Sequence, residues 1–285
     1  MADVLDWLLA GDPAVRWQVQ RDLLDEPWEP TRALVATEGW GAQLLSHRGA
    51  DGTWPTGWYS PKWVSTFSSL QVLQLLGIPA PESVHALLGF GLHDDGVFTP
   101  WSSRRDDICV TGMMLGMAQV AGVEMPGALG RLLSAQFPDG GWNCQLKDTH
   151  SSVHTTLNVL AGIAPFEADA QVATAAERGR EFLLRHRLYR SCRTGEVIQP
   201  AFTRFSFPYY WFYDVLRALD YWRGHPWDDR LSEAVDLLRS KQHDGRWNLQ
   251  NKRSGRTWFD METPGEPSRW NTLRALRVLR WVDAG

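Results

Sequence analysis

A tetrapeptide of the form Asp-Gly-x-aromatic recurs along this chain and constrains its fold more than any other feature. Copies begin at Asp51, Asp95, Asp139 and Asp244, and the first three are spaced by 44 residues. The fourth begins 105 residues after the third, which leaves room for two periods with insertions, and a weak copy begins at Thr194 between them. A fixed period of this size predicts a stacked or ring-closed array of structural repeats.

Each copy is flanked by stretches in which apolar residues recur with the spacing of an α-helix. The Asp-Gly pair supplies the turn between them, because Gly adopts positive φ and Asp caps the chain locally. The aromatic residue can fold back onto both helices, so Trp54, Trp142 and Trp247 are expected in equivalent positions. The expected helices after the turns, with one earlier stretch, are Ala14–Leu24, Val64–Leu76, Ile108–Val120, Val153–Ile163, Tyr209–Trp222 and Trp270–Val282. Those before the turns are Arg32–Ser46, Glu82–Gly91, Gly127–Gln136, Ala168–Arg187 and Leu231–Gln242, with Val4–Leu9 as a sixth.

The two sets of helices differ in composition. Stretches after the turns, such as Val110–Val123, are almost continuously apolar or small, whereas those before them, such as Ala168–Arg187, carry many charges. A helix that is apolar all round is buried, and a charged one is peripheral. We therefore predict an all-α fold in which residues 1–285 form a single (α/α)6 toroid, or barrel, of helical hairpins. An open solenoid is the alternative, but neither end carries the polar repeat that caps a solenoid.

Composition narrows the classes of function. The formal net charge is −4 and the isoelectric point is about 6.1, so the charge gives no indication of a nucleic-acid-binding protein. No signal peptide is visible and no apolar run reaches the length of a transmembrane span. Three cysteines do not form a disulfide framework, and a reducing, cytoplasmic setting is expected. Sixteen tryptophans exceed ordinary usage, and some are expected to line a cavity.

Two of the turns carry an additional glutamine. Gln136–Trp142 reads Gln-Phe-Pro-Asp-Gly-Gly-Trp, and Gln242–Trp247 is a shorter version. These turns resemble the glutamine–tryptophan motif of the prenyltransferase and squalene-cyclase superfamily, and the resemblance extends from about Glu38 to the end of the chain. In that superfamily the substrate occupies the bore of the toroid. The resemblance therefore implies an enzyme that handles an apolar or isoprenoid small molecule. Prenyltransferases of this kind also work with a helical partner subunit, and the sequence does not show whether this chain has one.

The residues after the second turn carry the candidate chemistry. Protein prenyltransferases hold zinc with an Asp-x-Cys pair and a later His-Thr, and Asp107, Cys109 and His154 match these positions. The resemblance thus implies zinc on these three side chains, with His150 and Cys144 as further donors nearby. In a regular helix, Asp107 and Cys109 would point roughly 200° apart, so they converge only at an irregular first turn. The alternative is that Asp107 caps the helix and Cys109 belongs to the core.

Class II terpene cyclases offer a second interpretation of this segment. Their Asp-x-Asp-Asp motif contains the proton donor, which aligns with Asp106, although Arg104 replaces the first acidic residue. The donor must be a neutral carboxyl in an apolar cavity, whereas Arg104 and Arg105 favour ionised carboxylates. These arginines suit an anionic head group such as diphosphate, or salt bridges with the preceding turn. Zinc-assisted prenyl transfer is therefore placed ahead of acid-initiated cyclisation, with Asp106 and Asp107 as the catalytic candidates.

Aromatic residues gather before the fifth expected inner helix, at 205–213. Aromatic faces in a bore could hold an isoprenoid chain and stabilise a carbocation. We expect Tyr209, Tyr210 and Tyr213, with Trp58 and Trp63, to contribute to such a wall. Ordinary core packing must account for most of the run, because its side chains cannot all face one way.

Two functions outside the isoprenoid class remain open. A carbohydrate-active toroid needs two carboxylates facing each other across the bore. The acidic residues available for such a pair are Asp106, Asp148, Asp214, Asp260 and Glu262. A non-catalytic binding toroid needs neither carboxylates nor metal. The last helix carries Arg274, Arg277 and Arg280 on one face, which we expect to be solvated or salt-bridged where the ring closes.

Overall fold

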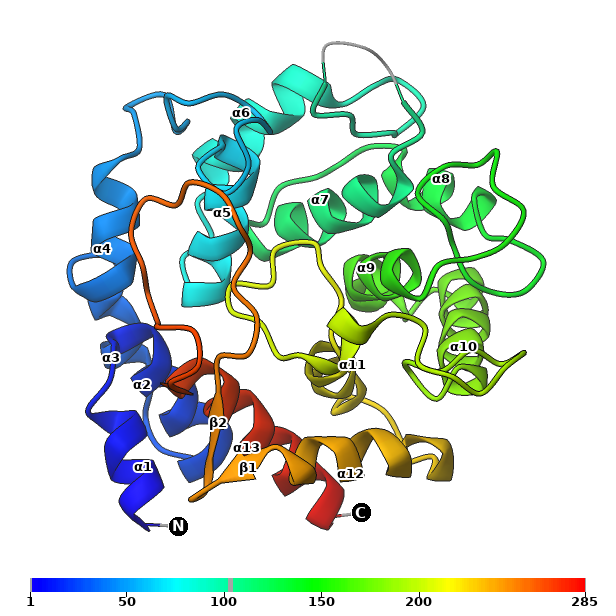
Figure 1. The fold of residues 1–285 in the computed structure, drawn as a ribbon. Coiled ribbons are helices and arrows are strands. Elements are labelled where there is room, and N and C mark those ends of the chain that lie inside the picture. Colours follow the sequence, from blue (N-terminus) through cyan, green and yellow to red (C-terminus); the bar gives the residue numbers. More distant parts are fainter. Residues whose placement is uncertain (1, 102–104, 285) are drawn as a thin grey trace.

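The chain is mostly α-helical, as the repeat pattern predicts. The computed structural model describes residues 2–101 and 105–284 (Figure 1). The helices are α1 (Ala2–Leu9), α2 (Pro13–Val19), α3 (Glu29–Leu34), α4 (Gly39–Ser46), α5 (Thr66–Leu76), α6 (Pro81–Gly91), α7 (Ile108–Val120), α8 (Ala128–Ser134), α9 (Val153–Ile163), α10 (Ala170–Arg185), α11 (Val215–Trp222), α12 (Ser232–Ser240) and α13 (Arg269–Ala284). A π-helical turn, Gln20–Leu24, extends α2. Across the described residues, no helix is long and apolar enough to cross a membrane.

A small sheet accompanies the helices and was not expected from the sequence. Strands β1 (Gln242–His243), β2 (Arg246–Asn248) and β3 (Pro267–Ser268) form an antiparallel sheet in the order β1-β2-β3. The fourth Asp-Gly turn joins β1 to β2, and Trp247 of β2 pairs with Ser268 of β3. The long segment that joins β2 to β3 therefore brings the chain back to the sheet just before α13 begins.

Most expected helices are present, with two differences. The stretch Arg32–Ser46 divides into α3 and α4, because α3 ends at Leu34 and the chain is extended at Glu38 before α4 begins at Gly39, whose φ is +62°. The stretch Tyr209–Trp222 becomes helical only from Val215, so the aromatic run is a loop. In Figure 1 this loop lies near the middle of the molecule, with helices around it.

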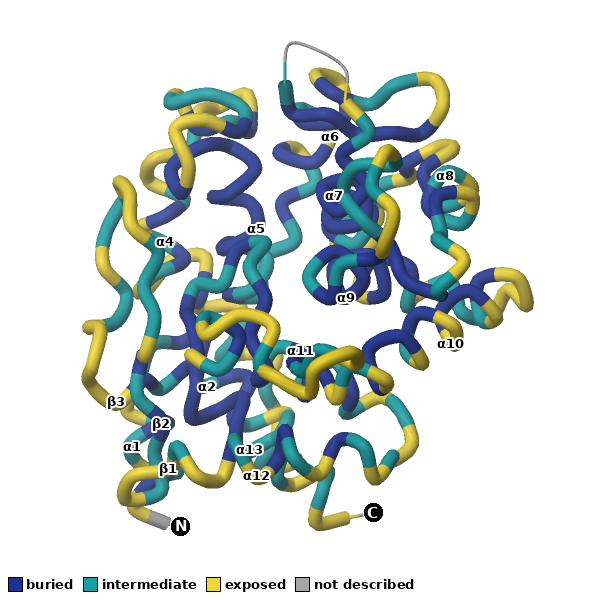
Figure 2. The backbone as a smooth tube through the Cα atoms, turned by 45° about the vertical axis from the view of Figure 1, so that its right-hand side comes forward, coloured by how far each residue is buried: buried dark blue, intermediate teal, exposed yellow. Residues whose placement is uncertain are grey.

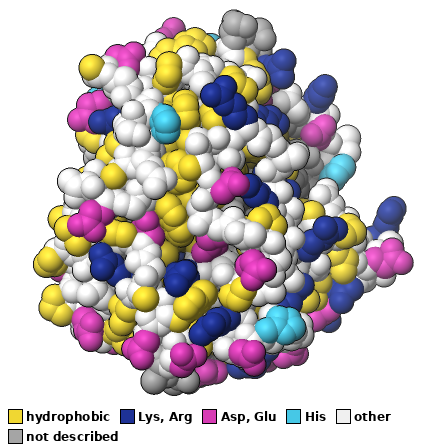
Figure 3. All heavy atoms as spheres, turned by 60° about the vertical axis from the view of Figure 1, so that its left-hand side comes forward, with side chains coloured by type: hydrophobic (Ala, Val, Ile, Leu, Met, Phe, Trp, Pro, Cys, Tyr) yellow, Lys and Arg dark blue, Asp and Glu magenta, His cyan; other side chains and the backbone are white. Residues whose placement is uncertain are grey.

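Burial separates the helices as their composition predicts. Helices α5 and α7 are buried along most of their length, whereas α10 and α12 bury one face (Figure 2). On one outer face, acidic and basic side chains are interspersed (Figure 3). The hydrophobic core is therefore built mainly from the helices that follow the turns.

The repeated glycine explains how each turn packs. Gly52, Gly96, Gly140 and Gly245 have φ values of 81°, 80°, 95° and 77°, the left-handed region that disfavours other residues. A Cβ on Gly96 would lie 2.2 Å from the carbonyl carbon of Gly127, at the start of α8. A Cβ on Gly245 would lie 2.8 Å from Cγ2 of Val4 in α1. Each of these two turns therefore contacts a helix of another hairpin, and the last one contacts α1.

The aromatic residue of each turn is held in the same way, which confirms the expected equivalence of the tryptophans. The backbone N–H of each donates to a threonine Oγ1 in the first turn of the following helix. The pairs are Trp54 with Thr66, Phe98 with Thr111, Trp142 with Thr156 and Trp247 with Thr272, each at 3.0 Å. The indole N–H of each tryptophan donates to a carbonyl of the preceding helix, from Leu44, Leu132 and Leu238. One buried aromatic residue thereby joins the two helices of each hairpin.

The helices that follow the turns contact one another in sequence. Helix α5 contacts α7, α7 contacts α9, and α11 contacts α13. Between α9 and α11, Arg217 donates to Asn158 Oδ1 at 2.6 Å. Gln18 of α2 donates to the carbonyl of Leu75 in α5 at 3.3 Å and accepts from Arg277 of α13 at 3.2 Å. The first and last helices of this set therefore lie side by side.

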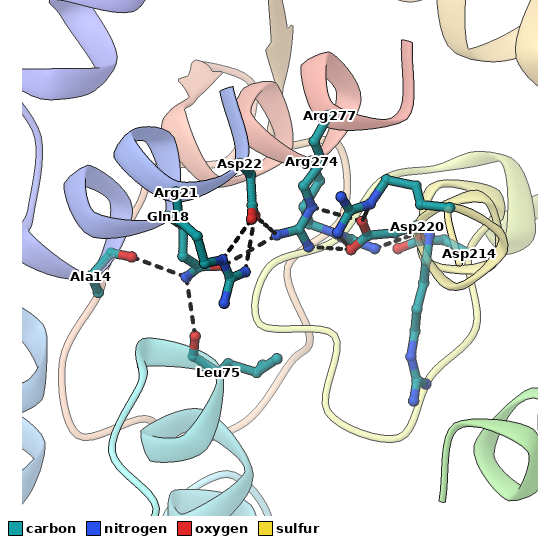
Figure 4. Close-up of polar contacts among 11 residues, drawn as sticks. Ala14, Gln18, Arg21, Asp22, Leu75, Asp214, Asp220, Arg274 and Arg277 are labelled. Atoms are coloured by element: carbon teal, nitrogen blue, oxygen red, sulfur yellow. Dashed lines mark hydrogen bonds and ion pairs between the residues drawn. The ribbon is translucent and has the colours of Figure 1, made fainter. Parts of the chain in front are cut away.

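A buried ionic cluster lies where α2, α11 and α13 meet (Figure 4). The side chain of Arg274 is 1% exposed and lies 3.5 Å from Asp220 and 3.9 Å from Asp214. Arg277 pairs with Asp220 and, at 3.1 Å, with Asp22. Within the described part of the chain, none of the Arg274 guanidinium nitrogens has a well-aligned hydrogen-bond partner. We expected Arg274, Arg277 and Arg280 to be solvated or salt-bridged. Arg274 is instead almost completely removed from solvent.

Candidate functional site

A pocket of about 380 Å³ lies at the N-terminal ends of α7 and α9. The repeated turns hold these helix ends in place. The backbone N–H of Phe98 donates to Thr111 in the first turn of α7, and that of Trp142 donates to Thr156 in the first turn of α9. Part of the wall is formed by aromatic and apolar side chains. The remaining side chains supply polar groups: hydroxyl, thiol, carboxyl, amide, ammonium and imidazole. The lining residues are Tyr59, Lys62, Trp101, Asp107, Cys109, Val110, Met113, Asn143, Cys144, Ser152, His154, Thr155 and Trp211. Asp107, Cys109, Cys144 and His154 of the predicted zinc site therefore line one pocket.

Asp107 is the buried carboxylate of this pocket. Its Oδ1 accepts a long hydrogen bond of 3.4 Å from Gln145 Nε2. Burial raises the pKa of Asp107, and the nearby Trp101 indole and Arg105 guanidinium only partly oppose that rise. In the described structure, neither the Trp101 N–H nor the Asp107 Oδ2 has a hydrogen-bond partner. Asp107 thus precedes the first residue of α7, as the capping alternative expects, but its side chain makes no cap hydrogen bond.

The two thiols of the pocket influence each other. The neighbouring Cys144 and burial raise the pKa of Cys109, whereas the neighbouring Cys109 lowers the pKa of Cys144. The backbone N–H of Cys109 also lowers the pKa of Cys144. The N–H of Ile108 donates to the Cys144 carbonyl at 3.2 Å. A thiol near the N–H groups that begin a helix is stabilised as a thiolate. Cys144 is therefore the more nucleophilic member of the pair.

His154 lies against a different set of neighbours. Its ring stacks on Trp211 with centroids 5.1 Å apart, and the side chain is half-buried and lines the pocket. Burial among protein atoms lowers the pKa of His154 to about 3, and the charges of Arg217 and Arg253 lower it further. The imidazole is therefore neutral at physiological pH, which is the form that binds metals.

The donor types in this pocket suit zinc, but their arrangement does not complete a site. Carboxylate, thiolate and neutral imidazole are all zinc ligands with bonds of about 2.0–2.3 Å. Over residues 2–101 and 105–284, no three His, Cys, Asp or Glu side chains are grouped closely enough to hold a metal ion. Zinc binding therefore stays a prediction, and no chemical step is derived from it.

Other predicted site residues lie outside the lining of this pocket. Asp106 is 42% exposed and accepts from Arg131 of α8 at 3.0 Å. The Arg105 guanidinium lies 5.1 Å from the ring centroid of Trp101. His150 is exposed, and its carbonyl accepts from Asn143. Arg104 lies outside the described residues. The basic residue that does line the pocket, Lys62, was not singled out from the sequence.

The predicted aromatic wall is divided among several environments. Trp63 stacks on Tyr210 with centroids 4.3 Å apart, and Trp58 stacks on Phe90 at 4.5 Å. Tyr213 is buried, and its hydroxyl donates to the Leu188 carbonyl. The aromatic residues that line the pocket are instead Tyr59, Trp101 and Trp211. Trp211 belongs to the aromatic run noted in the sequence, whereas Tyr59 and Trp101 had no distinguishing pattern.

A second chamber of about 260 Å³ lies between α5, α7 and α9. Small residues of α7 and α9, including Gly112, Gly116 and Gly162, leave this space, and Tyr209 and Tyr210 from the aromatic loop form part of its wall. The side chain of Met113 lines both chambers, so it separates them.

Comparison with known proteins gives little further information. No protein-family model and no curated protein matches this chain. A crystal structure of a protein from Actinoplanes is similar at 18% sequence identity and a TM-score of 0.48, covering 96% of this chain and 90% of that chain. The function is therefore inferred from the pocket.

Proposed function

We propose that this chain is an enzyme that binds an isoprenoid or a similar branched apolar molecule in the pocket at the N-terminal ends of α7 and α9. The observation that carries the proposal is one pocket that combines Tyr59, Trp101 and Trp211 with a buried carboxyl and two thiols. Small-molecule sites are mostly apolar, with a few polar groups that orient the ligand. An isoprenoid with a polar head has the same division between a long apolar part and a compact polar end.

We also infer that the helices form a closed (α/α)6 toroid whose bore contains both chambers. The cycle of contacts from α2 through α5, α7, α9, α11 and α13 supports closure. The contact of Gly245 with Val4 supports it independently in the outer layer. In such a toroid the substrate would enter beside the starts of α7 and α9 and extend towards Met113.

The polar end of the ligand would lie near Lys62, whose ammonium is 5.2 Å from the Trp211 ring centroid. A cation here suits an anionic head such as diphosphate. Asp107 is the one carboxylate among the described lining residues, which makes it the candidate general acid or base in place of Asp106. Its Oδ2 is free to hold or accept a proton at the substrate.

The carbohydrate alternative is less well supported. Glycosidases need two carboxylates that flank the scissile bond. Asp214 instead accepts from the backbone N–H of Arg217 at the start of α11, and Glu262 accepts from that of Trp270 at the start of α13. Asp260 pairs with Lys252 at 2.5 Å. Among the five acidic residues considered for this role, none lines the pocket.

Binding of farnesyl diphosphate and geranylgeranyl diphosphate, measured by calorimetry, tests the proposal. We expect the wild type to bind at least one of them and Trp211→Ala to weaken binding by about tenfold, ~1.4 kcal/mol, because an aromatic wall is removed. Asp107→Asn should retain most of the affinity and lose turnover. Trp227→Ala, at a 38% exposed position away from the pocket, is the matched control and should change neither. Absence of binding by the wild type, or equal losses in both tryptophan variants, would contradict the proposal.

Zinc is tested separately by elemental analysis of the purified protein. The prediction from the resemblance is one zinc per chain that is lost in Cys109→Ser and in His154→Ala. Retention of zinc in both variants, or its absence from the wild type, would show that these residues do not form a zinc site. Neither result affects the expected binding of the isoprenoid.

A further inference from the structure

Cys109 and Cys144 are brought together by two separate segments. Cys109 lies in the first turn of α7, and Cys144 follows the third repeated turn by two residues. The hydrogen bond from Ile108 N–H to the Cys144 carbonyl, at 3.2 Å, holds these segments at a spacing like that of paired strands, about 5 Å. Disulfides form between cysteines whose Cα atoms are about 4.4–6.8 Å apart. Both cysteines line the same pocket, so their side chains face the same space.

Both thiols line the pocket, but Cys144 is more accessible than Cys109. Cys144 is half-buried and Cys109 is 9% exposed, and both line the same pocket. The remaining cysteine, Cys192, is exposed and belongs to a different segment. A small reagent that enters the pocket would therefore meet Cys144 first, with Cys109 directly behind it.

We propose that Cys109 and Cys144 are a dithiol pair that closes into a disulfide on exposure to a small-molecule disulfide. The Cys144 thiolate attacks one sulfur of the reagent, forms a mixed disulfide and releases the other half as a thiolate. The Cys109 sulfur, losing its proton to solvent, then attacks the Cys144 sulfur and releases the second half. The protein loses two electrons and two protons, and the reagent is reduced to two thiols.

The disulfide would alter the pocket beside Asp107. It would join the start of α7 to the segment that precedes α9, and it would remove both thiols as polar or nucleophilic groups. Oxidation is therefore a means of switching the site off, and reduction would restore it. The formation of the bond does not depend on which ligand the pocket takes.

The test treats the whole protein with 2-hydroxyethyl disulfide in the presence of a chelator and maps the products by non-reducing mass spectrometry. In the wild type we expect a peptide cross-linked through Cys109 and Cys144, and a mixed disulfide at Cys192. In Cys109→Ser, Cys144 should keep the mixed disulfide, because nothing resolves it. In Cys144→Ser, Cys109 should stay unmodified because it is buried. Cys192→Ser is the control and should form the internal cross-link unchanged.

Two outcomes would overturn the inference. One is a stable mixed disulfide at Cys144 of the wild type while Cys109 remains a free thiol. The other is a pair of unmodified thiols at 109 and 144 in a sample whose Cys192 has reacted. Circular dichroism of each variant establishes that the fold is retained before the products are compared.

Discussion

Replacing Asp220 with asparagine is expected to lower the free energy of unfolding by about 3–5 kcal/mol, because it removes the carboxylate nearest to the buried Arg274. Asp220 of α11 lies 3.5 Å from Arg274 and 2.9 Å from Arg223, and it also pairs with Arg277. Arg274 has no other close carboxylate than Asp214, at 3.9 Å, within the described residues. Urea unfolding at neutral pH measures the change. Asp283→Asn is the matched control, since its pair with Arg239 is exposed and is worth about 0–1 kcal/mol.

The same carboxylate should make stability depend on pH. Burial alone would raise the pKa of Asp220, but Arg277, Arg274 and Arg223 outweigh burial and lower it from 3.8 to about 2. A carboxyl with a lowered pKa in the folded state contributes stability above pH 3.8, and the contribution is lost as the pH falls from about 4 to 2. The wild type should therefore lose more stability than Asp220→Asn across this interval. Parallel pH profiles of the two proteins would contradict the assigned charge.

Replacing Trp142 with alanine should also destabilise the chain by about 3–5 kcal/mol, the range for deleting a large buried aromatic side chain. The ring is fully buried, and its N–H donates to the Leu132 carbonyl at 2.7 Å. It also packs on α10, where a Cβ on Gly179 would lie 2.6 Å from the ring. The deletion therefore removes contacts within one hairpin and with the next helix.

Chemical denaturation followed by circular dichroism measures this effect. Trp227→Ala is the control, because Trp227 is 38% exposed and its loss should cost less than about 1 kcal/mol. Thr156→Val should give an intermediate loss of about 1–3 kcal/mol, since it leaves the backbone N–H of Trp142 buried without an acceptor. Equal effects at Trp142 and Trp227 would mean that the repeated aromatic does not hold the hairpin together.

The sequence was most informative where structure depends on neighbouring residues. Positive φ at the repeated glycines and the tucked tryptophans followed from local turn chemistry and from periodicity. The threonine that holds each aromatic was missed, although Thr66, Thr111, Thr156 and Thr272 stand at corresponding places in successive repeats. Alignment of the repeats on their helices would have revealed it.

Features that depend on distant segments were less predictable. Asp107, Cys109, Cys144 and His154 do share a pocket, because each is positioned by the start of α7 or α9 or by the segment that precedes it. Asp106, one residue away, points instead to Arg131. The sequence pattern placed both carboxylates together, but the irregular backbone before α7 directs them differently. Burial of an arginine likewise depends on partners from other helices, so no local pattern identifies it.

The contact between α2 and α13 has a consequence for how the protein reaches its native state during synthesis. Helix α2 leaves the ribosome well before Arg277, which binds Gln18 and Asp22 and lies 259 residues after Gln18. Contacts between residues so far apart in sequence form slowly, because a long loop must close first. One face of α2 therefore stays uncovered until α13 has been synthesised.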